Sequence, residues 1–247
     1  MNKKSIFILL ITLMTFSGIA QTFVSEQRKN SRVKTAYSEK EAIVKKLLSD
    51  NKIENFNIDI YIRVFKQEKI VELWAKSKTV KIYSHITDYK ICSSSGELGP
   101  KRLQGDGQTP EGFYFINRFN PYSNFYLSLG LNFPNQADKI VTAGTQPGGD
   151  IFIHGSCVTI GCVPLTDEKI KELYIFAIEA KSHGQEKVPV HIYPCKMTTE
   201  NIVVLKKNNS SLITFWESLK PAYDNFEKNK TVPSFTVDKK GNYVIKN

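Results

Sequence analysis

Residues 151–165 read Ile-Phe-Ile-His-Gly-Ser-Cys-Val-Thr-Ile-Gly-Cys-Val-Pro-Leu, and they place His154 at the end of an apolar strand and Cys162 directly after a glycine. A thiol becomes a good nucleophile only as a thiolate, and a neighbouring imidazole is the usual means of forming one near neutral pH. The stretch therefore predicts a catalytic pair. The competing interpretation is a buried structural thiol, and taken alone it is the better one, because such pairs occur often by chance. Other features of the chain favour the catalytic interpretation over the structural one.

The N-terminus has the three parts of a secretory signal: two lysines, an apolar run over 6–16, and small residues over 17–20. We expect residues 1–20 to be removed as a signal peptide, so that the mature chain begins at Gln21. The apolar run is shorter than the ~20 residues of a membrane-spanning helix, and no lipoprotein cysteine follows it. The sequence therefore predicts a protein exported to the periplasm or cell envelope, with no stable membrane anchor.

The net charge of the chain indicates which classes of partner it could bind. The 247 residues carry a formal net charge of +10, which falls to +8 without the two lysines of the signal (10 − 2). This balance suits an anionic partner such as a cell-wall polymer or a membrane surface, and simple solubility explains it equally well. Nucleic acid is a poor candidate, because the chain has neither a recognition helix nor an aromatic platform.

Four cysteines in an exported chain, Cys92, Cys157, Cys162 and Cys195, allow three full disulfide pairings. A nucleophilic Cys162 must stay reduced. The pairing of Cys92 with Cys195 would leave the motif untouched, but the sequence does not establish it. The set of His154, Cys157 and Cys162 lacks the Cys-x-x-Cys spacing of structural zinc sites, so we expect no metal and no other cofactor.

Periodicity predicts a β-rich chain with flanking helices. Residues 21–37 read as a flexible basic leader, and Ser38 with Glu41 forms a capping box that starts the first helix. From residue 57 the apolar period becomes two, as in strands. We expect strands over residues 58–65, 70–74, 80–83, 89–92, 113–117 and 188–193.

Irregular and helical segments complete the prediction. The long aromatic stretch 118–150 is expected to form a lid or cleft wall, with an ordinary surface excursion as the alternative. Thr166 caps a helix that ends at Gly184. Near the C-terminus we expect a helix over 212–226, kinked by Pro221, and then a hairpin, both packed on the rest of the chain.

Two motifs in the correct order resemble a known family. The segment 105–114, Gly-Asp-Gly-Gln-Thr-Pro-Glu-Gly-Phe-Tyr, is followed by His154-Gly155 and by Thr-Ile-Gly-Cys at 159–162. Together they resemble the YkuD-type L,D-transpeptidases, in particular the YafK-like branch, over roughly residues 57–195.

The resemblance implies a mainly β catalytic domain with flanking helices (α+β), in which the nucleophile lies beside a cleft roofed by loops. It divides the chain into a leader and N-terminal helix over 21–55, a catalytic domain over 56–195, and a helix and hairpin appendage over 196–247. The substrate class that it implies is the stem peptides of peptidoglycan.

The resemblance also assigns roles. Cys162 matches the nucleophile, and His154 matches the base, whose ring is oriented by the carbonyl of Gly155 or Ser156. Thr159 and Gly161 match positions before the nucleophile, and the N–H groups of Gly161 and Cys162 are placed in sequence to stabilise an oxyanion. Further candidates for substrate contact or support are Thr109, Pro110, Glu111, Gly112 and Cys157.

The sequence also departs from the larger branch of the family. Members of that branch carry an arginine just after the nucleophile, which helps to bind a substrate carboxylate, whereas Val163 and Pro164 follow here. Carboxylate recognition must then come from elsewhere, with Lys101 and Arg102 as candidates, or the substrate lacks that feature.

These observations predict a cysteine L,D-transpeptidase that acts on peptidoglycan through a thioester. The alternative is a hydrolase that trims stem peptides or releases proteins attached to the wall. A non-catalytic wall-binding module and a secreted domain with Cys157 oxidised to Cys162 are less favoured. The other histidines, His85, His183 and His191, have no partner motif and read as structural or solvated.

Overall fold

The computed structural model describes residues 23–246. The predicted signal peptide, 1–20, lies outside these residues. Within the described part, no helix is both long and apolar enough to cross a membrane.

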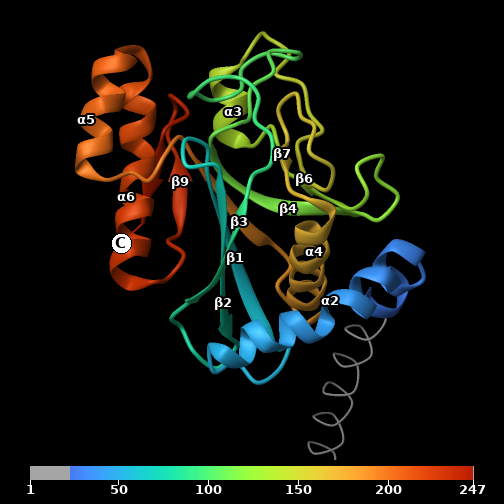
Figure 1. The fold of residues 1–247 in the computed structure, drawn as a ribbon. Helices are drawn as coiled ribbons and strands as arrows, with labels where there is room; N and C mark the ends of the chain where they lie inside the picture. The colour runs from blue at the N-terminus through green and yellow to red at the C-terminus, as the bar shows by residue number, and fades with distance from the viewer. Residues whose placement is uncertain (1–22, 247) are drawn as a thin grey trace, which may run out of the picture.

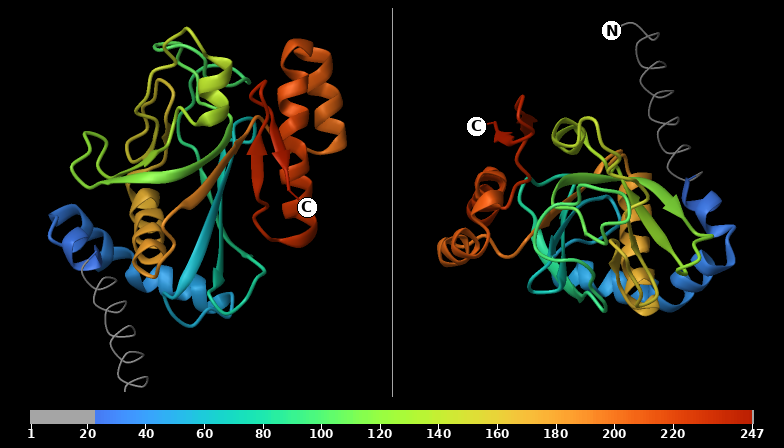
Figure 2. Two further views of the ribbon diagram at one scale, coloured as in Figure 1. Left: turned by 180° about the vertical axis from the view of Figure 1, so that it is seen from behind. Right: turned by 90° about the horizontal axis from the view of Figure 1, so that it is seen from above.

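The centre of the molecule is one mixed, curled sheet of eight strands in the order β3-β2-β1-β8-β4-β5-β6-β7 (Figure 1; Figure 2). Neighbouring strands are antiparallel except for the pairs β1–β8 and β6–β7, which are parallel. The predicted β-rich fold with flanking helices is confirmed. The strand bounds are β1 Ile58–Phe65, β2 Ile70–Ser77, β3 Ser84–Lys90, β4 Gly112–Asn120, β5 Ser128–Leu131, β6 Phe152–His154, β7 Val163–Pro164 and β8 Val188–Tyr193.

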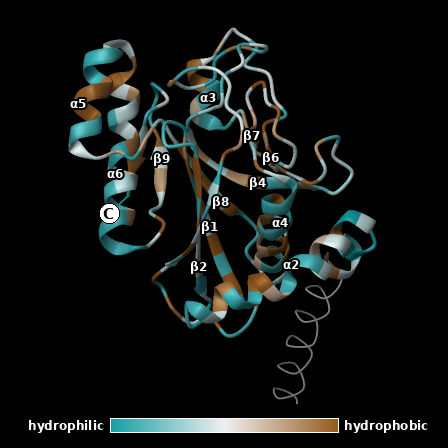
Figure 3. Cartoon of the chain, viewed as in Figure 1, coloured by the Kyte–Doolittle hydropathy of each residue, from teal (hydrophilic) through white to brown (hydrophobic). Residues whose placement is uncertain are grey.

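The sheet curls around helix α4 (Asp167–Ser182), which is buried on nearly all sides. Alternate side chains of β1, such as Ile60 and Ile62, pack with α4 in the largest apolar cluster of the fold. The hydropathy colouring of Figure 3 shows the central strands as largely hydrophobic. Because α4 begins shortly after β7, this core fixes the position of β7, the strand that directly follows Cys162.

The other face of β1 is covered by the C-terminal segment: α5 (Thr199–Asn208), a short 3-10 turn, α6 (Ile213–Asn229) and the hairpin of β9 (Phe235–Val237) and β10 (Tyr243–Ile245). The predicted helix is thus present as α6, with Pro221 inside it. Its aromatic side chains pack on strand residues; Tyr223, for example, contacts Phe65 edge-on. Arg63 of β1 is buried under α6 and pairs with Glu72 at 2.5 Å.

The first helix begins earlier than predicted. Helix α2 runs over Ser31–Asp50, its N-cap is Asn30, and residues 23–28 are helical as well, so the expected flexible leader is wrong. Val33, Ala36 and Tyr37 follow a helical spacing and are buried, and their apolar face holds this basic segment against the domain.

Two further predictions need correction. Residues 80–83 lie in a turn, and one strand, β3, replaces the two strands expected over 80–83 and 89–92. The stretch 118–150 is less irregular than expected, because it contains β5 and helix α3 (Gln136–Val141). Asn135 and Asp138 form a reciprocal capping box at the start of α3, a local signal that the prediction missed.

Candidate active site

Strands β6 and β7 lie side by side at one edge of the sheet and carry the two motif residues. Ile153 pairs with Val163, and both are buried in the core that contains α4. Side chains alternate across a strand, so His154 projects from the opposite face, as Phe152 does. Cys162 directly precedes β7, and its Sγ is within hydrogen-bonding reach of the backbone N–H of Phe152. The imidazole and the thiol are therefore brought to one face of the sheet edge.

The imidazole of His154 is held in a defined tautomer. Its Nδ1 lies 2.5 Å from the carbonyl oxygen of Gly155, and the ring stacks on Phe125 with a centroid separation of 4.6 Å. A carbonyl oxygen only accepts, so Nδ1 carries the proton and Nε2 keeps its lone pair. Burial holds the pKa of His154 below its usual value, against the opposing effect of the Gly155 carbonyl. His154 is thus a neutral base near pH 7.

The turn after His154 is fixed by groups from other elements. Gly155 donates its N–H to the carbonyl of Leu127, and Ser156, in the left-handed region with φ 66°, donates its N–H to Oδ1 of Asp167 at 2.8 Å. A Cβ on Gly155 would come within 2.6 Å of the same carboxylate oxygen. Asp167, from the first turn of α4, is a positioning residue that the sequence analysis did not identify.

Cys162 is a neutral thiol at rest. Its Sγ lies 3.7 Å from the carbonyl oxygen of Asp150, to which the S–H donates. Burial raises the pKa of the Cys162 thiol, and the Asp150 carboxylate adds to this, while the Phe152 N–H and the Lys101 ammonium act in the opposite direction. The thiolate therefore does not accumulate near neutral pH, and Cys162 would need a base to act as a nucleophile.

These shifts predict the pH dependence of Cys162 alkylation by iodoacetamide. A raised thiol pKa favours the protonated form, so the alkylation rate should rise in one step at a pH above the ordinary range of a thiol. The measurement is peptide mass spectrometry, which separates Cys162 from the other free thiol, Cys195. A rate plateau between roughly pH 5 and 7, typical of a thiolate–imidazolium pair, would contradict the neutral pair.

Thr159 organises the backbone before the nucleophile. Its Oγ1 accepts the N–H of Gly161 at 3.1 Å and donates to the carbonyl oxygen of Cys162 at 2.9 Å. The prediction that the Gly161 N–H serves the oxyanion needs correction, because that donor is already engaged. Among the described residues, the N–H of Cys162 has no backbone hydrogen-bond partner. It is the donor that remains for an oxyanion.

Replacing Thr159 with Val should cost about 1–3 kcal/mol of stability, because the Gly161 N–H and the Cys162 carbonyl lose their partner. Acylation of Cys162 should slow as the loop loosens. Thr159→Ser keeps the hydroxyl and should behave like the unmodified protein. Urea unfolding and single-turnover acylation measure the two effects. If the Val and Ser variants have the same stability and the same acylation rate, the Thr159 hydroxyl does not have the role assigned to it.

The two sequence motifs meet at Gly161. Its φ is 135°, and a Cβ there would lie 2.9 Å from the carbonyl oxygen of Gln108, so only glycine fits. Beside this contact lies a cavity of about 310 Å³ that opens next to the nucleophile. Its lining comes from Cys162, Val163, Thr109, Ile91, residues 93–98, and the β1–β2 turn with Val64, Lys66, Gln67 and Lys69.

Comparison with known proteins shows the family of the chain. Residues 59–192 match the family described as the L,D-transpeptidase catalytic domain, YkuD, which is more than half of the chain. The chain belongs to the YkuD family of L,D-transpeptidases. It is 40% identical over 188 residues to the Escherichia coli K12 protein named "Putative L,D-transpeptidase YafK", covering 75% of this chain and 73% of that protein. The O157:H7 counterpart matches equally.

Solved structures give a more distant match. The "helical cell shape determining protein Pgp2" of Campylobacter jejuni superposes with a TM-score of 0.44 and 22% identity, over 69% of this chain. The chain spans 58% of the length of Pgp2.

Both residues expected to replace the arginine of the larger YkuD branch are already engaged. Lys101 is buried and pairs with Asp106 at 2.6 Å, and Arg102 lies 3.4 Å from a carboxylate oxygen of Asp138. Partial burial acts to raise the pKa of the Asp106 carboxyl, but the Lys101 ammonium and three backbone N–H groups outweigh it and lower that pKa to about 2. Lys101 and Arg102 therefore stabilise the loop and do not offer a free cation to a substrate.

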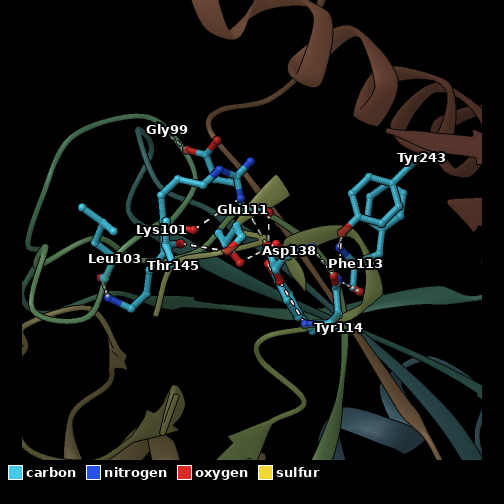
Figure 4. Close-up of polar contacts among 12 residues, drawn as sticks. Gly99, Lys101, Leu103, Glu111, Phe113, Tyr114, Asp138, Thr145 and Tyr243 are labelled. Atoms are coloured by element: carbon cyan, nitrogen blue, oxygen red, sulfur yellow. Dashed lines mark hydrogen bonds and ion pairs between the residues drawn. The ribbon is translucent and has the colours of Figure 1, made fainter. Parts of the chain in front are cut away.

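Most of the Thr-Pro-Glu-Gly motif is structural in this YkuD domain. Thr109 lines the cavity, as predicted for a substrate-binding position. Glu111 is fully buried and accepts a hydrogen bond from the N–H of Gly99 (Figure 4). It accepts a second hydrogen bond from Trp216 Nε1. The three residues after Thr109 are buried and do not line this cavity, so the structure gives no support to their predicted substrate contacts. Those buried residues are Pro110, Glu111 and Gly112.

The disulfide differs from the pairing considered first. Cys92 bonds to Cys157, with 5.4 Å between their Cα atoms, and Cys162 and Cys195 are free. Both the Cys92–Cys195 pairing and a Cys157–Cys162 disulfide are thus wrong. Cys92 also donates its N–H to the carbonyl of Pro164, so the bridge ties the loop between His154 and the nucleophile to the segment that walls the cavity.

Removing this bridge with Cys92→Ser and Cys157→Ser together should cost about 2–4 kcal/mol, because it cross-links residues 65 apart in sequence and restricts the unfolded chain. The test is guanidinium unfolding of the double variant beside Cys195→Ser, which removes a thiol but no cross-link. Unfolding midpoints that coincide for the double variant and the unmodified protein would contradict the expectation.

The remaining histidines lie away from the cavity. His85 is exposed and pairs with Asp88, and His183 bonds to a carbonyl of its own helix. His191 is buried 2.7 Å from the Tyr61 hydroxyl, and burial lowers the pKa of His191 to about 3. It is therefore a neutral core residue.

Proposed function

We propose that this YkuD-family protein is a cysteine-dependent L,D-transpeptidase that acts on peptidoglycan stem peptides through a thioester on Cys162. The observation that carries the proposal is the neutral pair at the sheet edge. His154 presents an unprotonated Nε2, fixed by the Gly155 carbonyl, on the face that carries the Cys162 thiol. A thiol with a raised pKa on the same face as a neutral base suits acyl transfer.

The first half-reaction forms the acyl-enzyme. His154 Nε2 takes the proton of Cys162 as Sγ attacks the carbonyl carbon of an amide at an L-configured residue of the stem peptide. The tetrahedral oxyanion is stabilised by the N–H of Cys162. When the C–N bond breaks, the imidazolium returns its proton to the leaving amine. The product is a thioester on Cys162 and a free amine.

The second half-reaction uses the same base. His154 removes a proton from an incoming amine, which attacks the thioester, and Cys162 leaves and recovers its proton. The new amide is a cross-link between stem peptides. Water in place of the amine gives a carboxylic acid, so transfer and hydrolysis share the first step. The energy of the original amide is conserved in the thioester.

We further propose that the protein works in the periplasm or cell envelope. The N-terminal signal pattern supports export, and the Cys92–Cys157 disulfide suits an oxidising compartment. Cell fractionation followed by N-terminal sequencing tests this proposal. A mature chain that begins at Gln21 in the envelope fraction is the expected result, and an unprocessed cytoplasmic chain would contradict it.

The proposed activity is tested by incubating defined disaccharide tetrapeptides with the protein and with Cys162→Ala, and then identifying the products by mass spectrometry. Cross-linked dimers made only by the unmodified protein would establish transfer. Tripeptide products alone would show a hydrolase instead. Products that form equally in the Cys162→Ala sample would exclude the proposed nucleophile.

A further inference from the structure

The cavity beside Cys162 has two lysines in its wall, and they are not equivalent. Lys66 is largely buried, and its Nζ contacts a carboxylate oxygen of Glu111 at 3.0 Å and the carbonyl oxygens of Gly99 and Thr109 at 2.7 and 3.0 Å. Two hydrogen bonds and one ion pair thus engage the ammonium group of Lys66. Lys66 is therefore neutralised by the fold and is not available to a ligand.

Lys69 has a free side chain on a fixed backbone. It ends the β1–β2 turn with φ 55°, donates its N–H to the carbonyl of Lys66, and accepts the N–H of Ile91 at 2.8 Å. Its side chain lines the cavity and is exposed. Within residues 23–246, the ammonium group of Lys69 has no hydrogen bond or ion pair. The cavity wall thus has one lysine that pairs with no carboxylate of the described residues, on a backbone held in place by hydrogen bonds.

We propose that Lys69 binds a side-chain carboxylate of the substrate in the cavity beside Cys162, and so takes the task that Val163, Lys101 and Arg102 cannot perform. This inference rests on the proposed function, because it concerns the ligand of the same cavity. A lysine ammonium pairs with a carboxylate as a point charge, and such charge-assisted bonds are among the stronger polar contacts. The ligand class is an acidic peptide whose carboxylate lies within reach of the cleaved amide.

Glu97 has the opposite charge to Lys69 and lines the same cavity. Its carboxylate would repel a substrate carboxylate. A substitution of Glu97 therefore shows whether a loss of binding comes from the lost charge of Lys69 or from any change in the cavity wall. Glu97→Gln should bind an acidic peptide as well as the parent protein or more tightly. Lys239, an exposed lysine in the β9–β10 turn, serves as a control for loss of one positive charge far from the cavity.

The experiment measures equilibrium binding to the full chain carrying Cys162→Ala, which cannot turn over. The probes are a synthetic stem tetrapeptide with a diamino-dicarboxylic acid at its third position, and the same peptide with the side-chain carboxylate of that residue amidated. Lys69→Met should weaken binding of the acid peptide by about tenfold and leave the amide peptide unchanged. Lys239→Met should change neither.

Equal losses for both peptides, or no loss for either, would overturn the role of Lys69. So would a loss with Glu97→Gln as large as that with Lys69→Met, or no binding of the acid peptide at all. Acylation of the protein with Cys162 intact is followed in parallel. Acid-selective binding through Lys69 without a thioester would refute the proposed function and keep the carboxylate site. If a thioester forms and neither its formation nor peptide binding changes in Lys69→Met, the carboxylate site is refuted and the proposed function is kept.

Discussion

Replacing His154 with Gln is expected to slow acylation of Cys162 by a factor of about 10²–10⁴ at neutral pH, the usual contribution of a general base. Burial and the Asp150 carboxylate raise the pKa of the Cys162 thiol, so few thiolates form without a base. The glutamine side chain in His154→Gln keeps polar atoms near the Gly155 carbonyl but has no basic nitrogen. The rate of thioester formation in a single turnover measures the effect.

The pH dependence makes this prediction specific. In the unmodified protein the rate should fall with decreasing pH only below the ordinary histidine range, because the pKa of His154 is lowered. In His154→Gln the acylation rate should rise with pH as the thiol ionises without a base. The difference in rate between the variant and the unmodified protein should therefore become smaller at alkaline pH. His85→Gln, at an exposed histidine, is the matched control. A deficit of constant size at every pH would argue against His154 as the base.

Replacing Glu111 with Ala is expected to destabilise the fold by about 3–5 kcal/mol, as for other buried ion pairs that lose one partner. The carboxylate is fully buried, and its loss leaves Lys66, Trp216 and the Gly99 N–H without their common acceptor. Trp216 belongs to α6, so the C-terminal segment should lose its attachment to the strand-β4 region at the same time. Urea unfolding followed by tryptophan fluorescence measures the loss.

Two control substitutions distinguish loss of the Glu111–Lys66 ion pair from nonspecific destabilisation. Glu97→Ala removes an exposed carboxylate nearby and should cost little. Adding Lys66→Met to Glu111→Ala should recover part of the loss, because it removes the uncompensated buried cation. A loss below about 1 kcal/mol for Glu111→Ala, or strictly additive effects of the two substitutions, would show that the pair is not a structural anchor.

The placement of His154 and Cys162 on one face of the sheet could be predicted because the segment that joins them is short. His154 ends β6 and Cys162 directly precedes β7, and one loop joins these two parallel strands. The catalytic roles of the two residues stay a prediction. Strand β1 could also be predicted, because every second side chain is apolar and packs in the core with α4. Helix α6 was readable from its aromatic face.

The other features depend on contacts between distant segments. The bond from Cys92 to Cys157 requires the segment after β3 to lie beside β7, which no local pattern indicates. Glu111 points inward because α6 supplies Trp216 as a donor, and the Thr-Pro-Glu-Gly motif by itself gives no sign of that direction. The early start of α2 depends on burial of Val33 and Tyr37 against the domain, which outweighs the basic composition of that segment.

The central claim is that Cys162 carries the acyl group, and intact-protein mass spectrometry after an acid quench tests it most directly. The protein is mixed with a stem tetrapeptide, and the mass and position of any adduct are determined beside Cys162→Ala. We expect an adduct equal to the peptide less its leaving amine, located on Cys162 and absent from the variant. Turnover in the Cys162→Ala sample, or an adduct on Cys195 alone, would contradict it.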